Sequence, residues 1–238
     1  MSRPFVSVVT PTYNRRKFIP ALIAIYKAQT YPKDRMEWII LDDGQEKVAD
    51  LFAEAGKTLP NIRYLSEPDK MTIGAKRNRL NAEAKGDIII SMDDDDYYLP
   101  ERVAYTVTAF GANPKVELAG CSEIYMYYTD IREIYKFGPY APKHATNGTL
   151  AIRSSYAKTH KYDEHVLNAE EKSFLDEYKN PMLQLNTMKV MLVISHKDNT
   201  FSKIKFREQT DNPFVKKTSL KIRDFIRDKQ TRDFFTSV

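Results

Sequence analysis

The chain has 238 residues, of which 42% are hydrophobic and 29% are charged, a balance that is typical of a folded globular protein and excludes a disordered one. No apolar run approaches the roughly 20 residues of a membrane-spanning helix, and the single cysteine, Cys121, excludes an intrachain disulfide. The net charge of +5 suits nucleic acid, an acidic membrane surface or an anionic substrate, and by itself selects none of them.

The first hundred residues alternate between strand and helix patterns. Residues 5–10 form an almost wholly apolar run that ends at Pro11, as in a strand buried on both faces. Further strands are expected at 38–41, 62–65 and 87–92, and helices at 17–29, 47–55 and 74–85. Strands that alternate with helices predict an α/β fold with a mainly parallel sheet and right-handed crossovers.

After Pro100 the pattern changes, and we expect a smaller, mixed α/β half that folds with the first half as one domain over residues 1–238. The expected parts are a nucleotide-binding half at 1–100, an acceptor half at 101–213 and a closing segment at 214–238. Expected elements are helices at 101–113 and 169–178, strands at 118–128, 131–137, 148–153 and 189–195, a long loop at 138–148, and a basic amphipathic helix at 218–236.

Three polar segments directly follow expected buried strands: residues 11–14, the pair Asp42–Asp43 and the run Asp93–Asp96. Ligands of open α/β sheets bind beyond the carboxyl ends of the strands, so these segments should share one edge. Four consecutive aspartates repel one another unless a cation or hydrogen bonds offset the charge. Because Mg²⁺ and Mn²⁺ prefer carboxylate oxygens, we predict a metal site here; a solvated acidic loop is the alternative.

Four sequence blocks stand in order along this half. They are VVTPTYNR at 8–15, IILDDG at 39–44, GAKRN at 74–78 and MDDDD at 92–96, the last followed by Pro100. This series resembles the GT-A glycosyltransferases of family 2, and especially the small virus-encoded members that glycosylate capsid proteins. The resemblance implies a GT-A fold with a Rossmann-like nucleotide-binding half. It is looser beyond residue 100, where it rests on 169–171 and 195–200.

The resemblance also implies which residues bind the nucleotide-sugar donor. Tyr13 would stack on the base, Asp43 would accept a hydrogen bond from it, and Arg77 would face the base or the diphosphate. The full implied set is Pro11, Thr12, Tyr13, Asp42, Asp43, Arg77, Asp93 and Asp94. Within the acidic run, Asp93 or Asp94 would hold the ribose.

For the metal, Mn²⁺ or Mg²⁺, the resemblance implies Asp95 with His196, and Asp93 stays a candidate because the run allows a shift of one residue. For catalysis it implies an acidic pair, Glu170–Glu171, that supplies the general base. The usual pair is Glu-Asp, so its second position selects Glu171. The alternative is a helix start, where acidic residues are stabilised by the helix dipole.

The predicted function is an inverting, metal-dependent glycosyltransferase that moves a sugar from a nucleoside diphosphate, most simply UDP, to a hydroxyl of a glycan or glycoprotein. We expect no nucleic-acid partner, a cytoplasmic location (the host cytoplasm if the protein is viral) and, through the C-terminal helix, a peripheral membrane contact.

One alternative is a phosphatase of the haloacid-dehalogenase type, although its DXD motif usually follows the first strand. Another is a non-catalytic protein that binds RNA or membrane through residues 216–232, a segment interrupted by aspartates.

Overall fold

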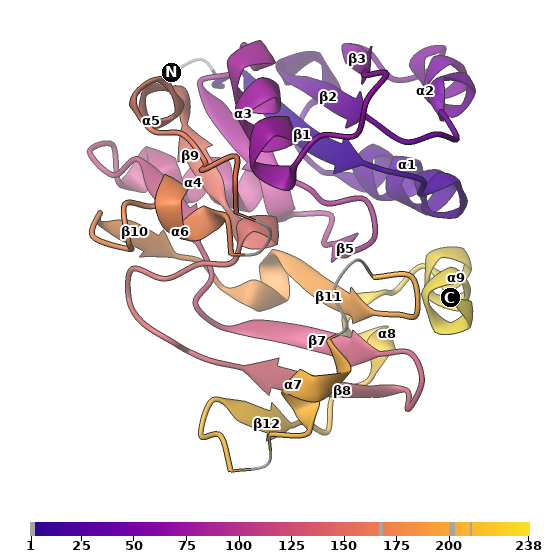
Figure 1. Cartoon of the computed structure of the whole chain (residues 1–238), viewed down its shortest axis with the longest axis vertical. Helices are drawn as coiled ribbons and strands as arrows, with labels where there is room; N and C mark the ends of the chain where they lie inside the picture. Colours follow the sequence, from indigo (N-terminus) through magenta and orange to yellow (C-terminus); the bar gives the residue numbers. More distant parts are fainter. Residues whose placement is uncertain (1–2, 167–168, 200–202, 210) are drawn as a thin grey trace.

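Two β-sheets form the framework of the protein (Figure 1). The structure is a computed structural model that describes residues 3–166, 169–199, 203–209 and 211–238. The strands are β1 (Val6–Thr12), β2 (Met36–Asp42), β3 (Ile62–Ser66), β4 (Ile88–Ser91), β5 (Tyr97–Tyr98), β6 (Leu118–Gly120), β7 (Ile124–Tyr128), β8 (Glu133–Phe137), β9 (Ala151–Arg153), β10 (Met182–Gln184), β11 (Met191–Ser195) and β12 (Val215–Lys217). The helices are α1 (Ile19–Ala28), α2 (Ala49–Gly56), α3 (Ile73–Glu83), α4 (Arg102–Ala112), α5 (Ser154–Thr159), α6 (Glu171–Phe174), α7 (Ile204–Arg207), α8 (Ile222–Phe225) and α9 (Lys229–Ser237).

The larger sheet has the strand order β10-β6-β9-β4-β1-β2-β3. Within this sheet β1 runs parallel to both β2 and β4, so that Val6 lies beside Met36 on one side and Ile88 on the other. Every residue of β1 and β2 is buried, which explains why both read as continuous apolar runs. The predicted parallel-dominated α/β fold is therefore confirmed, with β9 added antiparallel to β4.

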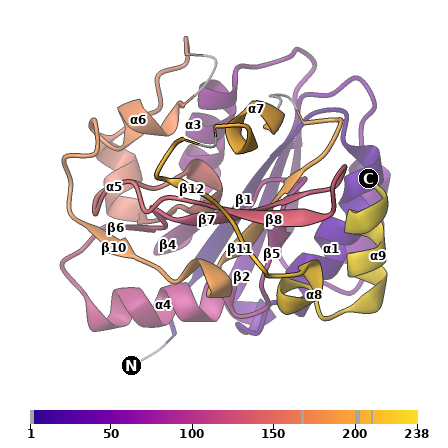
Figure 2. The same ribbon diagram turned by 90° about the horizontal axis from the view of Figure 1, so that it is seen from below.

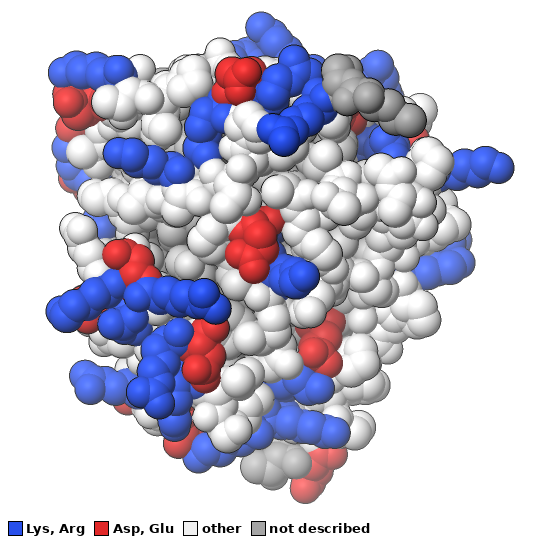
Figure 3. Space-filling view, turned by 180° about the vertical axis from the view of Figure 1, so that it is seen from behind, with Lys and Arg blue, Asp and Glu red and all other residues white. Residues whose placement is uncertain are grey.

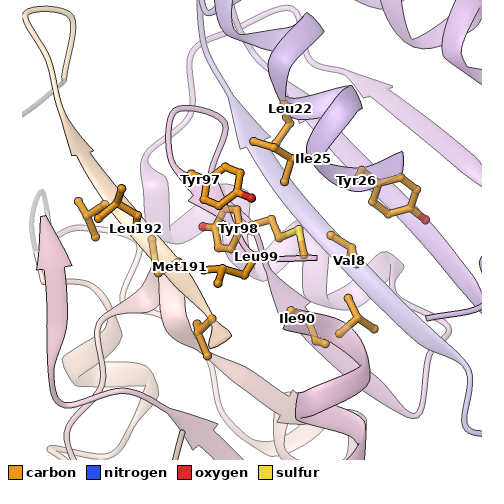
Figure 4. Close-up of a cluster of buried hydrophobic side chains, with 14 of the residues drawn as sticks. Val8, Leu22, Ile25, Tyr26, Ile90, Tyr97, Tyr98, Leu99, Met191 and Leu192 are labelled. Atoms are coloured by element: carbon orange, nitrogen blue, oxygen red, sulfur yellow. The ribbon is translucent and has the colours of Figure 1, made fainter. Parts of the chain in front are cut away.

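The second sheet has the strand order β12-β8-β7-β11-β5, with the two residues of β5 at its edge. Tyr97 and Tyr98 pair antiparallel with Leu192 and Met191 of β11, directly after the aspartate run. Figure 4 shows these tyrosines between β11 and the side chains of β1 and α1, all within one hydrophobic cluster. Both sheets therefore share one hydrophobic core at Tyr97 and Tyr98, the residues that directly follow the aspartate run.

The strand predicted at 118–128 and the helix predicted at 169–178 differ from the structure. The strand predicted at 118–128 is divided: β6 lies in the first sheet beside β9, whereas β7 lies in the second beside β8 and β11. Apolar alternation cannot reveal such a change of sheet. The helix predicted at 169–178 is only α6, because Asp176, Glu177 and Tyr178 adopt positive φ values of 48°, 54° and 59°, which end a right-handed helix.

The single basic helix predicted at 218–236 is wrong. This segment instead contains two separate helices, α8 and α9, and it follows β12, which pairs with β8. A new helix begins at Asp228, whose carboxylate caps it by accepting the Thr231 N–H at 2.7 Å. Of the apolar residues predicted for one helix face, Phe225 and Ile226 are buried, whereas Leu220 and Ile222 are only partly buried. Among the described residues, no helix is both long and apolar enough to cross a membrane.

Candidate active site

The polar segments that follow β1, β2 and β4 lie along one edge of the larger sheet. Pro11 and Thr12 are buried and stand beside Leu41 and Asp42 in the parallel register. The aspartate run begins two residues after β4, on the other side of β1. Carboxylate, hydroxyl and tyrosine side chains are therefore brought to one place by the sheet itself.

A cleft of about 1280 Å³ opens at this edge. It lies between the start of α3, the start of α6 and α7, which Figure 2 shows along one side of the molecule. Its basic lining residues are Arg15, Arg16, Lys17, Lys70 and Lys76, and its acidic ones are Glu46, Glu170, Glu171 and Asp198. The volume suits a ligand the size of a nucleotide sugar, and the cations suit an anionic one.

Tyr13 is half-buried and lines the cleft, so its ring is not part of the core. The ammonium groups of Lys70 and Lys76 lie 4.6 and 5.7 Å from the centre of the ring. Such cation–π contacts hold the ring in place and leave it on the cleft wall. Its stacking on a nucleotide base remains a prediction.

Asp42 and Asp43 have different surroundings. Asp42 accepts the N–H groups of Gly44 and Val48 at 2.8 and 3.1 Å, and thereby fixes the turn that leads into α2. Asp43 is fully buried, and its two oxygens accept the Met71 N–H at 2.7 Å and the Lys76 ammonium at 2.8 Å. Lys76 therefore lies between Asp43 and the cleft, and a direct contact from Asp43 to a base stays a prediction.

Replacing Asp43 with alanine is expected to lower the free energy of unfolding by about 3 kcal/mol, because it leaves the buried Lys76 ammonium without its partner. Adding Lys76→Met to the same chain should restore most of that loss, since the stranded charge is removed. Urea unfolding of both single variants and the double variant measures the coupling. Equal stability of Asp43→Ala and the parent would show that the pair contributes nothing.

Arg77 connects the aspartate run with the acidic pair of α6. Its guanidinium donates to Asp93 at 3.0 Å and to Glu170 at 2.8 Å, and the Asn147 amide lies against it. Burial alone would lower the pKa of Arg77, but the two carboxylates raise it, so the group stays charged. A planar fork that holds two carboxylates fixes their distance and orientation. Arg77 therefore positions Glu170, and with it the neighbouring Glu171.

Glu171 lines the cleft and is only partly exposed. Burial and the charge of Glu170 raise the pKa of Glu171 to about 7. A carboxyl that titrates near neutral pH is well matched to accept a proton from a hydroxyl. Because Glu170 is engaged by Arg77, Glu171 is the member of the pair whose carboxyl has these properties.

His196 lies beside the aspartate run, although about a hundred residues separate them in sequence. Its Nε2 is 3.3 Å from Asp95 Oδ2, and its ring packs on Phe18 with centroids 4.7 Å apart. Burial alone would raise the pKa of Asp95, but the hydrogen bond with His196 and the charges of Lys203 and Arg15 hold it well below its usual value. Of the motif at 195–200, Thr200 lies outside the described residues.

The four aspartates face different partners. Asp93 contacts Arg77, and Asp96 accepts the Ile194 N–H of β11 at 2.8 Å. Burial and the charge of Asp95 raise the pKa of Asp94 well above its usual value. Asp94 and Asp95 both lie near Arg15, at 3.7 and 3.4 Å. The run is therefore divided between a contact with α3, a pair beside Arg15 and a contact with β11.

The side chains of the aspartate run and His196 can be compared with the ligands that a divalent ion needs. Asp95 and His196 are close enough to share one, whereas Asp93 is held by Arg77; across the described ranges, no group of three or more His, Cys, Asp or Glu side chains is arranged to hold a metal. Asp94 and Asp95 supply the carboxylate oxygens that Mg²⁺ and Mn²⁺ prefer. A histidine ligand would favour Mn²⁺, since Mg²⁺ is bound through oxygen.

Three residues of this site had no predicted role. Lys76 covers Asp43, Arg15 contacts Asp94 and Asp95, and Asn199 donates to Asp95 at 3.2 Å and to the His196 ring. Arg15 and Lys76 belong to the sequence blocks quoted above, so their motifs pointed to the region but not to their contacts. Asn199 follows β11 in the looser block and carries no such signal by itself.

Residues 7–171 match the family described as glycosyl transferase family 2. The chain belongs to this family. An uncharacterized glycosyltransferase of Methanocaldococcus jannaschii is 27% identical over 226 residues, which cover 86% of this chain and 76% of that one. The glycosyltransferase AglE of Haloferax volcanii is 30% identical over 93 residues, 39% of this chain and 31% of that one. The predicted enzyme class is confirmed, and the resemblance to virus-encoded members stays a prediction.

Solved structures share the fold. TarS of Staphylococcus aureus in complex with UDP superposes with a TM-score of 0.63 at 19% identity, over 80% of this chain and 60% of that one. The mannosyltransferase PcManGT of Pyrobaculum calidifontis, in complex with GDP-Man and Mn²⁺, gives 0.65 at 16% identity, over 84% and 59%. The chain thus spans about 60% of these two solved chains, and the likeness confirms the predicted GT-A fold.

Proposed function

We propose that this protein is an inverting, metal-dependent glycosyltransferase that transfers a sugar from a UDP-sugar to a hydroxyl of a glycan or glycoprotein. The observation that carries the proposal is the arrangement of three groups at one edge of the sheet. Tyr13 with its lysines and Glu171 line the cleft, and the aspartate run beside His196 contacts Arg15 of that lining. Tyr13 with its lysines suits a nucleotide, the aspartate run a divalent ion with a diphosphate, and Glu171 an acceptor hydroxyl.

The reaction requires one displacement. The Glu171 carboxylate takes the proton of the acceptor hydroxyl, whose oxygen forms a bond to the anomeric carbon of the sugar. The bond from that carbon to the diphosphate oxygen breaks, and the nucleoside diphosphate leaves with the electron pair. Attack from the face opposite the leaving group inverts the anomeric centre.

Negative charge on the departing diphosphate must be offset. Asp95 and His196 would hold the ion that supplies the compensating positive charge when bound. The chain itself contributes Lys76 and Arg15 on the cleft wall, which attract and orient the diphosphate. Burial and the charge of Asp95 raise the pKa of Asp94, so a cation added nearby would favour ionisation of this carboxyl.

The two alternatives have less support. The family match replaces the haloacid-dehalogenase interpretation, because that class belongs to another fold. A nucleic-acid-binding protein would need a continuous basic surface. On the face in Figure 3, basic and acidic side chains are intermixed, and ion pairs such as Lys229–Asp233 and Lys217–Glu133 neutralise the C-terminal segment.

A thermal-shift series tests the proposal. With Mn²⁺, a UDP-sugar at 100 times its dissociation constant should stabilise the protein by about 2.7 kcal/mol and raise its melting temperature. GDP- and TDP-sugars in the same series test the choice of base, and Mn²⁺ alone and EDTA are the controls. A melting temperature that no nucleotide sugar changes would contradict the proposal.

A further inference from the structure

Several aromatic side chains of the second half are exposed beside the cleft. Tyr140, Phe206 and Phe214 are 40%, 39% and 40% exposed, whereas most large aromatic residues of the protein are buried in the core. Single exposed apolar residues need no explanation, but a group of them on one surface marks an interaction site. Phe206 also lines the cleft, so this group adjoins the proposed active site.

Four rings form a continuous series, which we call the aromatic strip: Phe214, Tyr140, His144 and Tyr178. Successive ring centroids are 5.3, 4.9 and 4.9 Å apart. The residues come from three separate segments: the 138–148 loop, the turn after α6 and the chain that leads into β12. The fold therefore assembles the strip from distant parts of the sequence.

The strip leads to the catalytic end of the cleft. Tyr178 lies three residues beyond Leu175, whose backbone carbonyl accepts the Tyr178 N–H at 3.0 Å, in the turn that closes α6. The Leu175 N–H in turn donates to the Glu171 backbone carbonyl at 2.8 Å, so two hydrogen-bonded turns connect Tyr178 with Glu171; burial and the charge of Glu171 raise the pKa of Tyr178 to about 12. A ligand lying along the strip would thus end at Glu171.

The chemistry of the strip suits a sugar chain. Aromatic faces carry partial negative charge and attract the C–H groups of a pyranose face. Hydroxyl groups at the edge of a sugar need hydrogen-bond partners, and Tyr140, His144 and Tyr178 each bring a polar group to the strip. An acyl chain of a lipid offers nothing that could hydrogen-bond with these groups. The strip therefore favours a ligand with apolar faces and polar edges.

We propose that the aromatic strip binds the sugar chain of a glycan acceptor and directs its terminal hydroxyl to Glu171. This inference rests on the proposed function and names the acceptor class as an oligosaccharide. Stacking supplies the affinity, and the continuity of the strip with the cleft supplies the direction. The donor side of the cleft is not involved.

Binding to a printed array of oligosaccharides, three to six sugars long and covering hexose, N-acetylhexosamine and deoxyhexose chains, tests the strip. The variant Tyr140→Ala/Phe214→Ala should bind the best-captured oligosaccharide at least about tenfold more weakly in calorimetry, given the energy of two stacked rings. Ile131→Ala is the matched control, since Ile131 is equally exposed at 40% but lies at the other end of the β7–β8 hairpin. UDP affinity should be unchanged in both.

The outcomes separate the two proposals. If the wild-type protein captures no oligosaccharide, or the double variant binds as tightly as Ile131→Ala, the strip does not bind glycans. If the strip variants lose glycan binding but the wild-type protein binds no nucleotide sugar, the strip assignment stands and the proposed transferase function fails.

Discussion

Replacing Glu171 with glutamine is expected to reduce sugar transfer by at least about 100-fold, the lower range for loss of a general base, while UDP binding stays unchanged. Glutamine keeps the shape of the side chain but cannot accept the proton of the acceptor hydroxyl. Steady-state transfer kinetics measure the first effect and calorimetry with UDP the second. Glu171 begins α6, whereas Tyr13 and Asp43 follow β1 and β2, so the two measurements should separate.

Glu170→Gln is the matched control for this experiment. Glu170 has no catalytic role of its own in the proposed reaction. Its carboxylate accepts a hydrogen bond from Arg77, which also donates to Asp93. Its loss should therefore weaken donor binding as well as transfer. A 100-fold loss in Glu170→Gln, with Glu171→Gln active, would reverse the assignment within the pair. Full activity in both variants would show that the acidic pair only stabilises the start of α6 and takes no part in catalysis.

The pH dependence follows from the raised pKa of Glu171. The base acts when ionised, so kcat/KM should fall about tenfold per pH unit below about 7, and this limb should be absent in Glu171→Gln. Between pH 4.5, the usual pKa of a glutamate, and about pH 7, the native state keeps the Glu171 carboxyl protonated, whereas the unfolded chain has released this proton. Stability therefore falls as pH rises through this window, and Glu171→Gln should unfold at a higher temperature than the parent at pH 8. An unchanged acidic limb in the variant would assign the titration to another group.

Replacing Asp95 with alanine is expected to abolish metal-dependent cleavage of the donor. His196→Ala should weaken Mn²⁺ affinity by about 10- to 100-fold, and excess Mn²⁺ should partly restore its activity. The double variant should be no worse than Asp95→Ala, because groups that serve one ion act as a unit. Donor hydrolysis measured against Mn²⁺ concentration distinguishes these cases.

Asp211→Ala is the control for the metal experiment, since Asp211 is an exposed carboxylate outside the cleft lining. It should titrate with Mn²⁺ as the parent does. Full activity of the parent protein in EDTA would contradict the metal-dependent mechanism as a whole. Independent effects of Asp95 and His196 that multiply in the double variant would contradict a shared ion.

The sequence predicted β1, β2 and β4 of the larger sheet well because these strands are buried on both faces, whereas β10 was not predicted. Continuous, mainly apolar sequences mark β1 (Val6–Thr12) and β2 (Met36–Asp42), and polar residues follow directly at the end of each strand. The second half was harder to predict, since its short strands join two different sheets. The division of 118–128 and the entry of β12 into the second sheet depend on tertiary pairing that no local pattern records.

The site was predictable in position but not in contacts. The strand-end rule and the family resemblance brought Asp43, Arg77 and Asp95 to one edge, and the structure places them there. Neither could indicate that Lys76 forms an ion pair with Asp43 or that Arg15 forms one with Asp95. These pairs depend on how side chains from separate segments meet in the folded protein. The family motif records a residue's position, whereas its partner is set by packing.

The aromatic strip and the donor residues differ in how freely they can change. The donor residues stand at the ends of strands whose side chains fill the core, where deleting a large side chain costs about 2–5 kcal/mol. Tyr140 and Phe214 project from exposed segments, and substitutions at such surfaces usually change stability by less than about 0.5 kcal/mol. New acceptor preferences can therefore arise by exchanging residues 138–144 and 211–215 between relatives, while the chemistry of the leaving group is inherited intact.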